Sequence, residues 1–164
     1  MLWLLWTALA VGADAWKDAP SDIIAETTVE APVETVNDYL LDLQRYGALF
    51  GPECADKWVF GTMTSGAEAT ARVTYRAGPM RRRATVTYGA TQAHVLVEIH
   101  HPGRLGFTSQ FVLEPLDSST KVTFATYLDP PPWPFRKVFL FKVRPAWEAC
   151  HQEALVALDQ AVSP

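Results

Sequence analysis

The chain has 164 residues, of which 49% are hydrophobic and 20% charged, and its formal net charge at pH 7 is −4. This length suits one domain, and this composition excludes general intrinsic disorder. The acidic balance disfavours nucleic acid as a partner, because a phosphate backbone selects basic surfaces. No apolar stretch reaches the roughly 18 to 20 residues that a membrane-spanning helix needs, so we expect a soluble globular domain.

The first fifteen residues predict an export signal. Met1–Val11 is an uncharged apolar run, and the Ala-Asp-Ala of residues 13–15 fits the small-residue site at which signal peptides are cleaved. No Lys or Arg precedes the run, so a buried or amphipathic N-terminal segment is the alternative. We expect a periplasmic or secreted protein, and a cytoplasmic one if the signal is not used. The chain then divides into a signal peptide, a linker and a ligand-binding domain, over residues 1–15, 16–21 and 22–162.

A strand and two short helices are expected next. Ile23–Glu30 is a β-rich run that ends at Ala31-Pro32. Apolar residues recur at helical spacing over 33–50, where Gly47 and Gly51-Pro52 interrupt them, which predicts one helix and then a short second one. Six further strands are predicted, over residues 57–61, 68–77, 80–91, 94–100, 104–114 and 121–128.

The last element is a long helix from Phe135 onward. Its apolar stripe consists of Phe139, Val143, Trp147, Cys150, Ala154, Leu158 and Ala161. Pro145 should kink this helix or restart it, because it removes one helical hydrogen bond. Strands and helices segregated in this way predict an α+β fold, in which the long helix covers the apolar face of a curved antiparallel sheet.

The order of elements resembles that of the START-like (SRPBCC) superfamily, which includes polyketide cyclases, birch-pollen-type allergens and coenzyme Q-binding proteins. The specific resemblance lies in TTVEAPVETVNDYLLDLQRYGALFGP (residues 27–52), with its Leu41-Asp42 turn, and in Arg144-Pro145 near the middle of the terminal helix. It covers about Asp22 to Val162. The resemblance implies a helix-grip fold of six to seven strands, with a cavity for an apolar ligand between sheet and helix. This superfamily has no shared catalytic motif, so no catalytic residue is carried over.

The residues independently supply apolar rings for such a cavity. Any single ring is more often part of a closed core, but a curved sheet and one helix rarely pack solid without a second layer. Arg82 and Ser109 are polar intrusions that a ligand could satisfy. Glu98 is either a third intrusion or lies on the wet face, depending on the strand register. We expect the pocket to be lined by Trp58, Phe60, Val73, Tyr75, Arg82, Val86, Tyr88, Phe107, Ser109, Phe111, Phe124, Phe139, Val143 and Trp147.

The sequence contains no recognisable catalytic, metal-binding or phosphate-binding motif, and we expect no cofactor. His100-His101 should be exposed at a strand end. Cys150 and His151 are helix neighbours that do not share a face, which disfavours a nucleophile pair. Nothing in the sequence places Cys54 beside Cys150, so we expect free buried thiols, although export would let them pair.

These observations favour a monomeric domain that binds a hydrophobic small molecule, such as a lipid, an isoprenoid or a polyketide-like compound. A cyclase or dehydratase enzyme is one alternative, in which a few polar residues would act as acid or base. An interaction module with a closed core is another. The run Arg81–Arg83 is either a solvated loop end or a site that attracts an acidic head group, which leaves peripheral membrane contact open.

Overall fold

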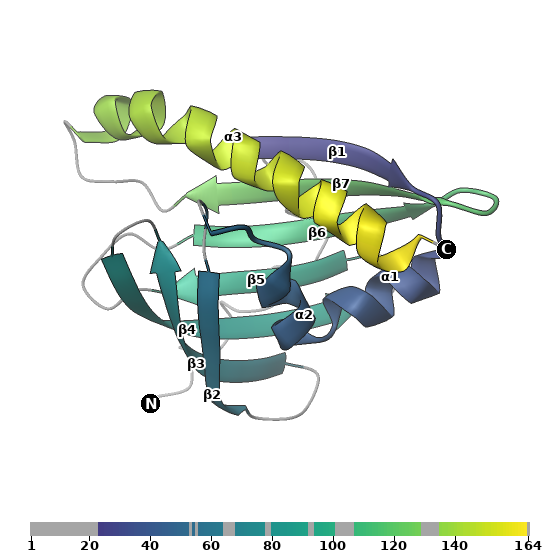
Figure 1. Ribbon diagram of the computed structural model, residues 1–164, viewed down its shortest axis with the longest axis horizontal. Helices are drawn as coiled ribbons and strands as arrows, with labels where there is room; N and C mark the ends of the chain where they lie inside the picture. Colours follow the sequence, from purple (N-terminus) through teal and green to yellow (C-terminus); the bar gives the residue numbers. More distant parts are fainter. Residues whose placement is uncertain are drawn as a thin grey trace, which may run out of the picture.

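The computed structural model confirms the predicted α+β helix-grip fold, with a seven-stranded antiparallel sheet and a long C-terminal helix lying across it (Figure 1). The structure describes residues 23–52, 54, 56–63, 68–77, 80–91, 94–100, 107–128 and 135–163. The predicted signal peptide and linker lie outside these residues. The elements are β1 (Ile23–Val29), α1 (Val33–Leu40), α2 (Leu43–Ala48), β2 (Asp56–Met63), β3 (Glu68–Ala77), β4 (Met80–Thr91), β5 (His94–His100), β6 (Phe107–Pro115), β7 (Thr120–Leu128) and α3 (Phe135–Val162).

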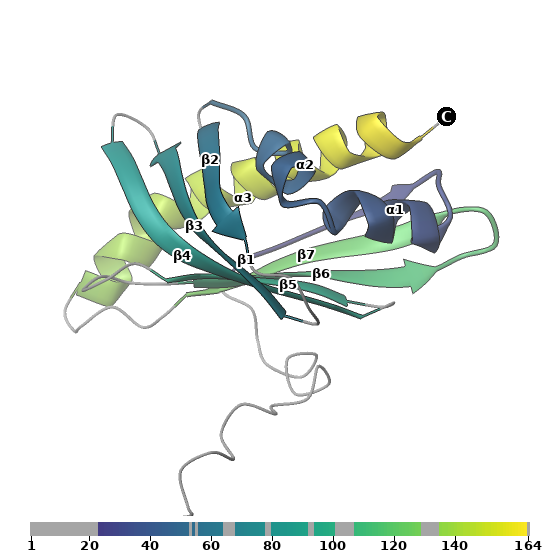
Figure 2. The same cartoon turned by 90° about the horizontal axis from the view of Figure 1, so that it is seen from below.

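The sheet is an open meander of β2 to β7, to which β1 is added as an edge strand beside β7. Its order is β1-β7-β6-β5-β4-β3-β2, so β1 pairs with the last strand and β2 forms the opposite edge. The three helices lie on one side of the sheet, and β2, β3 and β4 curve up toward them (Figure 2). We call this side the concave face. Among the described helices, none is long and apolar enough to cross a membrane.

Two helices follow β1, as predicted, and the break between them lies at the Leu41-Asp42 turn named in the family resemblance, not at a glycine. The Asp42 side chain caps α2 by accepting hydrogen bonds from the backbone N–H groups of Gln44 (2.9 Å) and Arg45 (3.3 Å). A short carboxylate at this position satisfies two donors that a helix start leaves free. Gly47 is buried inside α2, so its spacing was a misleading signal.

The strand register settles the position of Glu98. Val95, Val97 and Ile99 are buried in the core, and alternation places Glu98 on the opposite, convex face. It therefore does not belong to the concave face.

The terminal helix is continuous through Pro145, so of the two expected effects, a kink or a restart, the structure excludes the restart. Ala154 and Leu158 are buried as the stripe predicts, whereas Ala161 is exposed. The buried stripe instead continues through Leu155 to the partly buried Val162, because the helical period of 3.6 residues drifts away from a fixed step.

Candidate functional site

The middle of the concave face is filled by stacked rings. Phe111 of β6 and Phe124 of β7 stack with centroids 4.1 Å apart, and the His151 ring of α3 stacks on Phe124 at 4.0 Å. Tyr46 of α2 meets Phe111 edge-on at 6.1 Å. Phe111 and Phe124, both predicted to line a pocket, are fully buried in this cluster. This part of the space between sheet and helix is a closed core.

A second ring pair marks the border of that core. Phe107, at the start of β6, and Trp147 of α3 meet edge to face with centroids 4.9 Å apart. Both were predicted to line the pocket, and both side chains are only partly buried. The sheet and the helix therefore each present one partly exposed ring beside the closed core.

A chain of buried polar groups runs between the two ring clusters. Ser109 Oγ lies 2.7 Å from Thr126 Oγ1, and Thr126 Oγ1 lies 2.8 Å from His151 Nε2. His151 Nδ1 lies 2.7 Å from the carbonyl oxygen of Trp147, one helical turn earlier. Ser109, Thr126 and His151 are 2%, 0% and 3% exposed. We call these three residues the polar chain.

Burial determines the protonation state of His151. Desolvation lowers its pKa to about 4, although the hydrogen bond to Trp147 and the charge of Glu148 act in the opposite direction. The ring is therefore neutral at pH 7. Sequence reasoning noted Ser109 but missed the chain, because only the cross-strand pairing of Ser109 with Thr126 and the rotation of α3 bring its members together.

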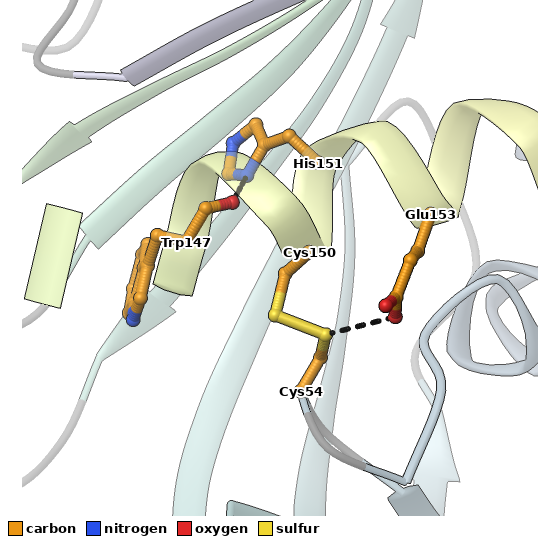
Figure 3. The surroundings of a disulfide bond; sticks show 5 residues. All are labelled: Cys54, Trp147, Cys150, His151 and Glu153. Carbon is orange, nitrogen blue, oxygen red and sulfur yellow. Dashed lines mark hydrogen bonds between the residues drawn. A yellow bond between two sulfur atoms is a disulfide. The ribbon is translucent and has the colours of Figure 1, made fainter. Parts of the chain in front are cut away.

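Cys54 and Cys150 form a disulfide, so the expectation of free thiols is wrong (Figure 3). Their Cα atoms lie 5.6 Å apart although the two residues are separated by 96 positions in the chain. The turn after α2 approaches α3 closely at Gly51, where a Cβ atom would lie 3.2 Å from Glu153 Oε2. The same carboxylate oxygen lies 3.5 Å from Cys54 Sγ. The disulfide thus fixes the end of the α2 turn to the middle of the long helix.

Figure 3 also shows that Cys150 and His151 leave α3 on different sides, in agreement with the sequence argument against a nucleophile pair. Cys150 carries no thiol in this state. The described residues contain no group of three or more His, Cys, Asp and Glu side chains that could hold a metal ion.

The other predicted lining residues fall into two sets. Val73, Val86 and Tyr88 are buried on the concave face of β3 and β4. Tyr88 donates a hydrogen bond from its hydroxyl to the carbonyl oxygen of Leu40 (2.8 Å), and burial raises its pKa, with the charge of Asp42 adding to the effect. That bond ties β4 to the end of α1. The remaining set lies outside the described side chains: Trp58, Phe60, Tyr75, Arg82, Phe139 and Val143. His100 and His101 lie outside them too.

Comparison with known proteins shows that solved structures share this fold. No family model matches the chain, and no curated protein shows significant similarity to it. Solved structures do match. The protein TTHA0849 from Thermus thermophilus is 17% identical with a TM-score of 0.69, covering 85% of this chain and 95% of that one. CV1439 from Chromobacterium violaceum is 15% identical with a TM-score of 0.62, covering 86% and 96%.

A third match is the Zhui aromatase/cyclase from Streptomyces sp. R1128, which is 16% identical with a TM-score of 0.55 and covers 85% of this chain and 88% of that one. Identities this low establish shared architecture only. They confirm, at the level of the fold, the START-like resemblance that the sequence predicts.

Proposed function

We propose that the chain binds a hydrophobic small molecule (a lipid, an isoprenoid or a polyketide-like compound) between the sheet and the first half of α3. The observation that carries this proposal is the partly exposed pair of Phe107 and Trp147. These rings are partly exposed to solvent at the edge of a closed core. An apolar ligand that covers them contributes about 25 cal/mol of favourable binding free energy per Å² of apolar surface removed from water.

The buried rings of the neighbouring core bound the proposed site on one side. Phe111, Phe124 and His151 are stacked face to face and buried, so they form a fixed wall rather than a space to be filled. A ligand would therefore lie against Phe107 and Trp147, at the border of this wall. A preformed apolar site with few polar groups is the usual form of a small-molecule site.

Calorimetric titration with a panel of fatty acids, quinones and polyaromatic compounds tests the proposal. Burial of apolar surface should give a negative heat-capacity change for at least one compound. Phe107→Asp should weaken that binding at least about tenfold, because it places a charge at the ligand. The matched control is Val156→Asp, which introduces the same charge at a side chain of α3 that is 55% exposed and should leave affinity unchanged.

Two outcomes contradict the proposal: no compound binds the wild-type chain, or the two aspartate variants lose affinity equally. Mass spectrometry of the recovered ligand addresses the cyclase or dehydratase alternative. A compound that returns with altered mass or altered fragmentation identifies an enzyme.

We also propose that the chain is exported to an oxidising compartment. The Cys54–Cys150 disulfide supports this, because such bonds persist in the periplasm or outside the cell and are rare in a reducing cytosol. The expected mature N-terminus is Trp16. N-terminal sequencing of the protein from its host tests this, and an intact Met1 in a cytosolic fraction would contradict it.

A further inference from the structure

The polar chain has one allowed direction of hydrogen bonding. The carbonyl oxygen of Trp147 can only accept, so His151 Nδ1 must carry the proton that bridges their 2.7 Å contact. A neutral imidazole has one N–H, and His151 is neutral at pH 7 because burial lowers its pKa to about 4. Nε2 is therefore an acceptor.

The two hydroxyls must follow this direction. Thr126 has a single hydroxyl proton, and it donates that proton to Nε2 across 2.8 Å. It can then only accept in its 2.7 Å contact with Ser109, so Ser109 donates its own proton to Thr126. The polar chain thus ends on lone pairs of Ser109 Oγ, which can accept a hydrogen bond but have no proton left to donate.

In the part of the molecule that the structure describes, no group donates a hydrogen bond to those lone pairs. Within the described residues, Thr126 is the single hydrogen-bond partner of Ser109 Oγ. Its other cross-strand neighbour is Val97, which is fully buried and apolar. Phe107, two residues earlier on the same face of β6, is the partly exposed ring of the proposed ligand site.

We infer that the ligand of the proposed site is an apolar molecule with a hydrogen-bond donor, such as a phenol or an alcohol, whose hydroxyl donates to Ser109 Oγ. The inference rests on the proposed function. Ser109 lies two residues from Phe107 on the same face of β6, so a ligand bound at Phe107 would have its hydroxyl next to Ser109, and the orientation of the polar chain would make this contact selective. Ketones, quinones and ethers offer only acceptors, which would meet the lone pairs of Ser109 without a proton between them.

The first test needs no ligand. Long-range ¹H–¹⁵N correlation spectra at pH 7 report which nitrogen of each histidine carries the proton, and His151→Gln identifies the signal of His151. We expect Nδ1 to be protonated and Nε2 to be bare. A protonated Nε2 would reverse the direction of the polar chain, leave a proton free on Ser109, and overturn the inference.

The second test compares 1-naphthol with 1-methoxynaphthalene, which have the same ring system but differ in the donor. The measured quantity is the ratio of the dissociation constant of the ether to that of the phenol. Ser109→Ala should lower this ratio about two- to tenfold, the range for one net hydrogen bond, with little effect on the ether itself. Ser118→Ala is the control, since Ser118 lies exposed in the turn between β6 and β7 and should leave the ratio unchanged.

A third variant tests the donor–acceptor direction of the hydrogen bonds, whereas Ser109→Ala tests whether the bond to the ligand exists. Thr126→Val keeps the shape of the side chain but removes the acceptor of the Ser109 proton, so Ser109 becomes able to donate. Affinity for 1-acetonaphthone, a ketone acceptor, should then rise relative to 1-naphthol. Before titration, far-UV and near-UV circular dichroism confirm that each variant keeps its secondary structure and the fixed packing of its aromatic rings.

The results separate this inference from the proposed function. If neither naphthalene binds the wild-type chain but a compound of the calorimetric panel does, the inference is wrong and the proposed function stands. If no compound of either set binds, both proposals are wrong. If both compounds bind and Ser109→Ala leaves their ratio unchanged, the inference is wrong and the proposed function stands. A lowered ratio in Ser109→Ala, together with a higher affinity of Thr126→Val for 1-acetonaphthone relative to 1-naphthol, supports the inference.

Discussion

Protonation of His151 should cost the fold part of its stability as the pH falls. The ring is 3% exposed, stacked on Phe124, and its Nε2 accepts a hydrogen bond from Thr126. A proton added at Nε2 would meet the Thr126 hydroxyl proton and would place a cation in the core. Burial therefore opposes the charged form, and the pKa of His151 falls from 6.5 to about 4 in the folded chain.

The sign and size of the effect follow from this difference. Between pH 6.5 and about 4, His151 is protonated in the unfolded chain but not in the folded chain. Its contribution to the free energy of unfolding is therefore fully present above pH 6.5 and is lost as the pH falls. The pKa difference corresponds to about 3 kcal/mol. Most of it, about 2 to 3 kcal/mol, should be lost between pH 7.5 and pH 4.5.

Urea denaturation of the wild-type chain and of His151→Gln, at pH 7.5, 6.5, 5.5 and 4.5 without reductant, measures this contribution. Glutamine does not titrate, and its amide oxygen can still accept from Thr126. Titrating carboxylates affect both proteins equally and cancel in the difference between their free energies of unfolding. That difference should shrink by about 2 to 3 kcal/mol on acidification. Parallel pH profiles of the two proteins would refute the reasoning.

Three further predictions concern stability, each measured by urea denaturation at pH 7.5. Tyr88→Phe should lower the free energy of unfolding by about 1 to 3 kcal/mol, because it leaves the buried carbonyl of Leu40 without its donor; an unchanged midpoint would contradict this. Reduction of the disulfide between Cys54 and Cys150, or its replacement by two serines, should cost about 2 to 5 kcal/mol, and coincident curves with and without dithiothreitol would show that it does not stabilise the fold. Trp147→Ala should cost about 2 kcal/mol, less than a fully buried ring, and a loss below about 0.5 kcal/mol would mean that its contact with Phe107 contributes little.

The fold was predictable because it rests on local periodicity. Alternation in β3 and β4 and the spacing of apolar residues in α3 both follow from the burial of one face, which the sequence displays directly. The register of β5 was not predictable from HVLVEIH alone, since either alternate set could be buried there. Glycine spacing alone misplaced the helix break, because in the sequence Gly47 is as good a signal for a backbone bend as Asp42 is; the turn at Leu41-Asp42 came from the family resemblance.

The site was only partly predictable, because its parts are remote in the sequence. Phe107 and Trp147 were identified as rings on apolar faces, but their partial exposure depends on where the stacked core ends. The polar chain joins positions on β6, β7 and α3, and none of its residues carries a motif. The disulfide joins positions 96 residues apart, and no spacing rule predicts such a contact.

The Cys54–Cys150 bond also closes a covalent loop of the chain that contains β2 to β7 and the first half of α3. Backbone cleavage at any one point inside this loop would leave the two fragments joined until a reductant breaks the disulfide. The bond also restricts exchange of α3 between two copies, a common route to swapped dimers. Such an exchange would have to carry Cys150 away from its own Cys54, and would therefore yield dimers linked by two disulfides. The disulfide therefore disfavours a swapped dimer formed by exchange of α3 in the oxidised protein.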